Sequence, residues 1–133
     1  MPFPIQEEYV QQTEEKINCR LPHYFREKLK VENGGTIHVL GDSWEIYPIY
    51  DSSDKNRIKR TCNNLITETE AARKWYGFPD EAIAIGENGS GDRLVLIRQS
   101  RSKYGEEVFA WNHETLELIS VAKNFEKLNE NEA

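Results

Sequence analysis

The chain contains almost no cysteine and no long hydrophobic segment. Cys19 and Cys62 are its only cysteines among 133 residues, which excludes the densely cross-linked scaffold of small secreted proteins. Apolar runs such as residues 94–97 fall far short of the ~20 residues that cross a bilayer. The residues after Met1 lack the basic and apolar regions of a secretory leader. We therefore expect a cytoplasmic protein with free thiols and no membrane partner.

Basic residues are also scarce. The chain has 17 Lys and Arg against 23 Asp and Glu, a formal net charge of −6. Binding to nucleic acid and to anionic membranes both depend on Lys and Arg. The composition therefore disfavours these partners and is compatible with a basic protein partner. With 38% hydrophobic and 11% aromatic residues, the chain can bury a core, and we expect a single domain over residues 1–133.

Helical periodicity appears in three long segments. Residues 5–18 repeat apolar positions every four residues, which predicts an amphipathic helix. A second helix should start at Leu21-Pro22 and stop at Gly34, because glycine readily takes the left-handed conformation that closes a helix. The longest predicted helix covers residues 55–77 after a cap at Asp54. Its expected core face consists of Ile58, Cys62, Leu65, Ile66, Thr69, Ala72 and Tyr76.

Strand patterns occupy much of the remaining chain. Residues 36–40 and 44–49 alternate like strands joined by a turn at 41–43, and Pro48 should place the second at a sheet edge or end it. Further strands are predicted at 82–85, 94–97, 108–111 and 116–121, with 94–97 apolar on both faces and therefore central. A short helix from Asn124 follows. These elements predict an α+β fold with one largely antiparallel (mixed) sheet of about six strands, packed by N-terminal, central and C-terminal helices.

The glycine-rich segment 86–92 is the richest loop. A phosphate cradle would need a helix immediately after it, whereas residues 93–97 have a strand pattern. A calcium loop could use Glu87, Asn88 and Asp92, but the alternating carboxylates and terminal Glu of an EF-hand are missing. We interpret the segment as a hairpin loop in which glycines supply positive φ and Asp92 caps nearby amides. No cofactor and no metal ligand set is expected.

The histidines offer little support for catalysis. His23, His38 and His113 show no metal-ligand spacing, and no Ser or Cys occupies a nucleophile motif. We place His113 in a tight turn between the last two strands and expect no catalytic residue. One enzymatic alternative stays open: a small hydrolase or ligand-binding domain in which Glu87, Asp92 and His113 converge in one pocket with shifted pKa values.

Acidic residues are segregated along the chain. Two segments, 36–54 and 78–92, contain acids but no Lys or Arg, whereas residues 55–77 have six basic and two acidic residues. If the acidic segments meet in space, they form a negative face that attracts a cationic protein. The acids of the two segments are Asp42, Glu45, Asp51 and Asp54, and Asp80, Glu81, Glu87 and Asp92.

Exposed aromatic residues beside these acids would anchor a partner, since interface hot spots favour Trp and Tyr. The candidates are Trp44, Tyr47, Tyr50 and Trp111, each of which could instead pack in the core. The predicted partner-binding set is Asp42, Trp44, Glu45, Tyr47, Tyr50, Asp51, Glu87 and Asp92.

A series of short stretches also occurs in a characteristic order: LPHY at 21–24 with NGG at 33–35, IYPI at 46–49, FP at 78–79 with IGENGSGD at 85–92, and VFAWNHE at 108–114. In order and spacing they resemble the Smi/Knr group of the SUKH superfamily over residues 18–125. The resemblance implies a non-catalytic protein. Bacterial members are mostly immunity proteins encoded beside polymorphic toxins, often nucleases, and eukaryotic members look like signalling scaffolds in cell-wall control.

Two binding functions follow from this resemblance and the charge pattern. The first is an immunity protein that neutralises a cognate basic toxin, such as a nuclease, by occlusion through an acidic surface. The second is a non-catalytic regulatory scaffold in cell-wall or signalling control, which could share the same fold and surface.

Overall fold

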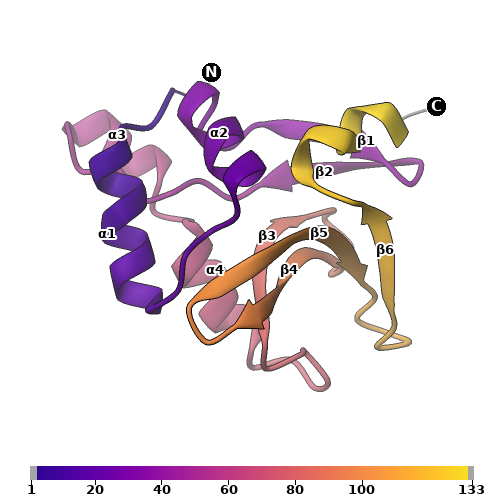
Figure 1. Ribbon diagram of the computed structural model, residues 1–133. Helices are drawn as coiled ribbons and strands as arrows, with labels where there is room; N and C mark the ends of the chain where they lie inside the picture. The colour runs from indigo at the N-terminus through magenta and orange to yellow at the C-terminus, as the bar shows by residue number, and fades with distance from the viewer. Residues whose placement is uncertain (1–2, 132–133) are drawn as a thin grey trace.

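The computed structural model describes residues 3–131 and shows helices packed on one antiparallel sheet (Figure 1). The order of the strands in the sheet follows their order in the sequence, β1-β2-β3-β4-β5-β6. The predicted α+β class is therefore confirmed, with every pair of neighbouring strands antiparallel. The elements are α1 Glu7–Ile17, α2 His23–Val31, β1 Thr36–Val39, β2 Asp42–Ile46, α3 Lys55–Arg60, α4 Leu65–Ala72, β3 Ala82–Glu87, β4 Arg93–Ser100, β5 Lys103–Trp111, β6 Leu118–Ala122 and the 3-10 helix η1 Phe125–Asn131.

The sheet topology decides which loops meet. In an antiparallel meander, alternate connections lie at the same end of the sheet. The turn 40–41 between β1 and β2, the loop 88–92 between β3 and β4, and the loop 112–117 between β5 and β6 therefore share one end. We call these segments the three-loop end. The sheet is curled, and η1 contacts both edge strands, β1 and β6 (Figure 1).

The core lies on both faces of the central strands. Leu94, Val95 and Leu96 of β4 are fully buried, which confirms the prediction of a central strand covered on both sides. Helix α4 packs closely on β3, where Thr69 Oγ1 accepts a hydrogen bond from the amide of Ala84 at 2.9 Å. Small side chains on the strand allow this approach. The other face packs on α2 and η1, with Phe25 and Phe125 5.3 Å apart between ring centroids.

The prediction of one long helix over residues 55–77 is wrong. The chain forms two short helices, because Asn64 accepts a hydrogen bond from the amide of Thr67 and begins α4 as a new N-cap. Thr61 ends α3. The predicted core face fails at its ends: Ile58 and Cys62 are exposed, and Tyr76, beyond the end of α4, is 87% exposed.

Smaller corrections concern the first two strands and α2. The turn between β1 and β2 is Leu40-Gly41, with both residues at positive φ, instead of residues 41–43. Strand β2 ends at Ile46, so Pro48 follows the strand and β2 lies inside the sheet. Pro22 is the N-cap of α2 and precedes its first turn.

Candidate protein-binding surface

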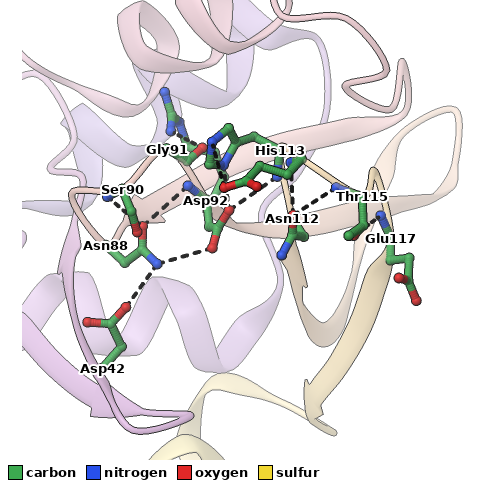
Figure 2. A network of polar contacts seen from close by, with 11 residues as sticks. Asp42, Asn88, Ser90, Gly91, Asp92, Asn112, His113, Thr115 and Glu117 are labelled. Carbon is green, nitrogen blue, oxygen red and sulfur yellow. Dashed lines mark hydrogen bonds and ion pairs between the residues drawn. The ribbon is translucent and has the colours of Figure 1, made fainter.

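The sheet brings half of the two acidic segments together. Glu45 of β2 and Glu87 of β3 are direct partners across the sheet, although 55–77 separates their segments in sequence. At the adjacent turn, the amide nitrogen of Asn88 donates to Asp42 at 2.9 Å and to Asp92 at 3.3 Å (Figure 2). Four of the predicted partner-binding acids therefore lie at or beside the three-loop end.

Asn88 organises the loop between β3 and β4. Its side-chain oxygen accepts from the amides of Ser90 at 3.0 Å and Asp92 at 3.3 Å (Figure 2). Gly91 has φ +108°, and a Cβ there would lie 3.0 Å from the ring of His113. The prediction of a glycine loop with positive φ is confirmed, but its local cap is Asn88, because the carboxylate of Asp92 reaches the next hairpin instead.

Asp92 joins the second loop to the third. Its Oδ1 lies 2.7 Å from Nδ1 of His113 and accepts from the His113 amide at 3.2 Å. Burial raises the pKa of the Asp92 carboxyl, but the hydrogen bonds from His113 and Asn88 outweigh burial and leave that pKa below its ordinary value. Asp92 therefore stays ionised while it holds two loops together (Figure 2).

The side chain of Glu87 is held in place by Tyr47. The hydroxyl of Tyr47 donates to Oε1 of Glu87 at 2.9 Å. Burial raises the pKa of Tyr47, an effect that Arg93 opposes and the hydrogen bond to Glu87 reinforces, so the phenol keeps its proton. The Glu87 side chain is thus held in place by a neutral hydrogen-bond donor.

Arg93 closes the base of the same loop. Its Nη1 donates to the carbonyl of Gly91 at 2.6 Å, and its guanidinium lies 5.9 Å from the centroid of the Trp75 ring. The residue is only 9% exposed, and Nε has no hydrogen-bond partner among the described residues. Arg93 is therefore a buried cation that joins this loop to Trp75, and it lies directly across the sheet from Glu87.

The converging acids share one electrostatic property. Within residues 3–131, no Lys or Arg forms an ion pair with Asp42, Glu45, Glu87 or Asp92. Their hydrogen-bond donors are amides, an asparagine, a tyrosine and a histidine ring. None of these donors is a Lys or Arg side chain, so among the described residues the four carboxylates are not balanced by direct ion pairs with Lys or Arg.

Several predicted contact residues lie elsewhere or inside. Trp44, Tyr47 and Trp111 are at most 3% exposed, so the expectation that they project as surface anchors is wrong. Each completes the core: the indole of Trp44 donates to the carbonyl of Val39 at 3.0 Å, and Trp111 meets Phe78 edge-on with ring centroids 5.2 Å apart.

The remaining predicted acids do not join the group. Asp51 is 2% exposed and lies 3.5 Å from Arg57, so its carboxylate is structural and the expectation of an exposed contact is wrong. Asp54 caps α3 through the amide of Arg57. Tyr50 is half-buried, with the ammonium of Lys16 5.7 Å from its ring centroid. Only part of each acidic segment therefore contributes to the negative surface.

The sequence reasoning missed the exposed apolar residues at this surface. Trp75 is 45% exposed and Tyr76 87%, directly after α4, and Leu116 in the third loop is 36% exposed. A readable signal was present, because two adjacent aromatic residues before Gly77 cannot both face the core from one helix. The predicted helix instead continued the helical repeat of residues 55–72 through Tyr76.

The enzymatic alternative is only partly matched by the geometry. Asp92 and His113 are in contact, but Glu87 binds Tyr47 instead of either residue. The cavity of about 340 Å³ beside α3 is lined by other residues, including Phe3, Glu45 and Arg57. In the described part of the chain, no three His, Cys, Asp or Glu side chains are grouped as a metal site requires. Nor does any described helix have the length and apolarity to cross a membrane.

Together, the curled antiparallel sheet and the helices packed on it define a single α+β domain with a group of acidic residues at its three-loop end. The chain belongs to the SMI1/KNR4 family (SUKH-1), whose family model matches residues 4–131. The resemblance found in the sequence is therefore confirmed over almost the whole chain. Among curated proteins, none matches the chain.

Proposed function

We propose that this chain is an immunity protein that binds and neutralises a cognate toxin without catalysis, in the cytoplasm of the cell that makes it. Membership of the SMI1/KNR4 family supports an immunity-type role. The proposal of an acidic binding surface rests on the four carboxylates at the three-loop end, which form no ion pair with any Lys or Arg of residues 3–131.

The charge of this group suits a nuclease toxin. Nucleases hold phosphates with Lys and Arg, so their substrate clefts are basic. An acidic surface raises the association rate with such a cleft by about 10- to 1000-fold at low salt and, once docked, occludes it. Fixed carboxylates also lose little conformational entropy on binding, because Asn88 and Tyr47 already hold three of them in place.

The test is rescue of growth. Cells that express the toxin domain encoded beside this gene should survive when the chain is co-expressed, and the purified proteins should form a complex that high salt weakens. Survival without a complex, or a complex without survival, would contradict neutralisation by occlusion. Recovery of wall-synthesis or signalling proteins by the wild-type chain, with no toxin bound, would instead support the regulatory scaffold.

A further inference from the structure

Two leucines at the three-loop end adopt a backbone conformation that leucine rarely takes. Leu40 has φ 57° and Leu116 has φ 65°, and the only other described non-glycine residue with positive φ is Asn18. A side chain with a Cβ is strained there, and Gly or Asn would be more stable in such turns. Both leucines are also exposed, at 55% and 36%. Burial in the core thus does not account for an apolar residue at either position.

Leu116 lies against the segment that follows α4. A Cβ on Gly77 would be 2.6 Å from Cδ1 of Leu116, so the leucine covers the bare glycine backbone. Three residues before Leu116, His113 meets the ring of Trp75 edge-on, with ring centroids 5.5 Å apart. These two contacts join residues 75–77 to the third loop. Since Asp92 holds His113, the whole corner is tied to the acidic group.

The resulting patch consists of Trp75, Tyr76 and Leu116, which we call the aromatic corner. Tyr76 is the most exposed of the three, at 87%. Interface hot spots are enriched in Trp and Tyr side chains. The corner is fixed before any partner arrives, because Trp75 contacts Arg93 below and His113 beside it.

Acidic residues surround the aromatic corner. Glu114 and Glu117 flank Leu116, and Asp80 and Glu81 follow Gly77, all of them exposed. Three cations lie nearby: Arg73 donates to the carbonyls of Asp80 and Ala82, Arg93 is buried against Trp75, and Lys74 is exposed, so the four acids outnumber them. A second copy of this chain would bring like charges together, and nucleic acid would be repelled, whereas a Lys- and Arg-rich protein surface is complementary.

We propose that the aromatic corner anchors the toxin complex. An apolar residue of a basic toxin packs against the corner, and Lys and Arg residues of the toxin surround that apolar residue. This inference rests on the proposed function and adds to it where the contact is centred. The acids of the three-loop end set the rate of approach, and Tyr76, Trp75 and Leu116 set the lifetime of the complex.

The experiment measures binding of the purified, catalytically inactive toxin domain encoded beside this gene. Tyr76→Ala should weaken the wild-type affinity by about 30-fold, mainly through faster dissociation. Tyr24→Ala, an exposed tyrosine on α2, is the matched control and should bind like the wild type. Because Tyr76 is 87% exposed, its removal should leave the thermal unfolding temperature unchanged.

A second variant separates binding from folding. Leu116→Asn places a residue that tolerates positive φ at that turn, so the fold should lose no stability while toxin affinity falls about 10-fold. If Tyr76→Ala and Leu116→Asn both bind the toxin domain with wild-type affinity, the inference about the aromatic corner is wrong and the proposed function still stands. No binding by the wild-type chain would overturn the proposed function with it. A wild-type dimer that Tyr76→Ala dissociates would show that a second copy occupies the corner and would also overturn the inference.

Discussion

The N-terminal helix pair and the three-loop end are both rich in acidic residues, but they use them differently. In the helix pair, Arg26 of α2 forms ion pairs with Glu7 and Glu14 of α1, and Lys30 also pairs with Glu7. At the three-loop end, the carboxylates accept hydrogen bonds from uncharged groups or from a histidine. The same residue types therefore join two helices in one region and leave a surface charge in the other.

The pKa values of the two regions reflect this difference. A hydrogen bond from Lys30, opposed by burial and assisted by Arg26, lowers the pKa of Glu7 to about 2. The pKa of Asp92 is also lowered, yet only His113 and Asn88 act against the effect of burial there. Both carboxylates are ionised at neutral pH. Lys30 and Arg26 pair directly with Glu7, whereas no Lys or Arg among the described residues pairs with Asp92.

Removing the carboxylate of Asp92 should have the largest effect on stability. Asp92→Ala leaves three donors, from Asn88 and His113, without their acceptor, which should cost about 2 kcal/mol. Urea unfolding measures the loss. Asp80→Ala, at an exposed acid, is the control and should stay within about 0.5 kcal/mol of the wild type. Equal losses in both variants would mean that the three-loop network does not stabilise the fold.

Removing the cation of the helix pair should have a smaller effect. Arg26→Ala breaks the pairs with Glu7 and Glu14. The loss should be about 1 kcal/mol, because Glu7 is 40% exposed and water screens its pair. Urea unfolding at low and high salt should show a larger loss at low salt. Affinity for the inactive toxin domain should not change, and a weakened complex would place the helix pair in the interface.

Neutralising surface acids should leave stability almost untouched. Asp42→Asn with Glu45→Gln preserves shape and removes only one exposed hydrogen bond, because one of the two Asp42 oxygens that accept from Ser43 and Asn88 becomes an NH2 group. The unfolding free energy should therefore change by only about 0.5 kcal/mol. Association with the toxin domain at low salt should slow about 10-fold, as stopped-flow fluorescence would show. Glu8→Gln with Glu15→Gln changes the net charge equally on exposed positions of α1. If both pairs slow association alike, net charge alone governs the rate.

The smallest effect concerns acid pH. Because the folded pKa of Glu7 is about 2 and its ordinary value is 4.5, the stability it contributes is present above pH 4.5 and is lost as pH falls toward 2. Asp92 acts in the same direction, since its pKa is also lowered. NMR titration of the carboxyl carbons measures both midpoints. A Glu7 midpoint near 4.5 would show that Arg26 and Lys30 do not pair with it in solution.

The strands of the sheet could be predicted from the sequence, but the residues exposed on the surface could not. Alternation and turn residues located the outer strands, and short apolar runs located the central ones, such as 94–97, which are buried on both faces. The helix 55–77 was misjudged because apolar spacing continues across the break, where the N-cap at Asn64 begins a new helix. Short local signals such as this cap compete with a long periodic one, and the structure shows which prevails.

Only part of the candidate binding surface could be predicted, and the reason differs from that for the helix. The two acidic segments could be recognised, but their meeting depends on the pairing of β2 with β3 across a long insertion. Burial of Trp44 and Trp111 likewise depends on which face of a strand each occupies. The exposed Trp75 and Tyr76 lie beyond a helix end, where periodicity no longer applies. Tertiary pairing, which no local pattern encodes, therefore decided which predicted residues reach the surface.

Hydrogen exchange on the chain alone and bound to the inactive toxin domain tests the contrast between the two regions most directly. Slower exchange on binding should appear in residues 40–43, 88–92 and 112–117, and residues 7–31 of the helix pair should exchange at the same rate in both states. Protection confined to residues 7–31, with the three loops unchanged, would contradict the account.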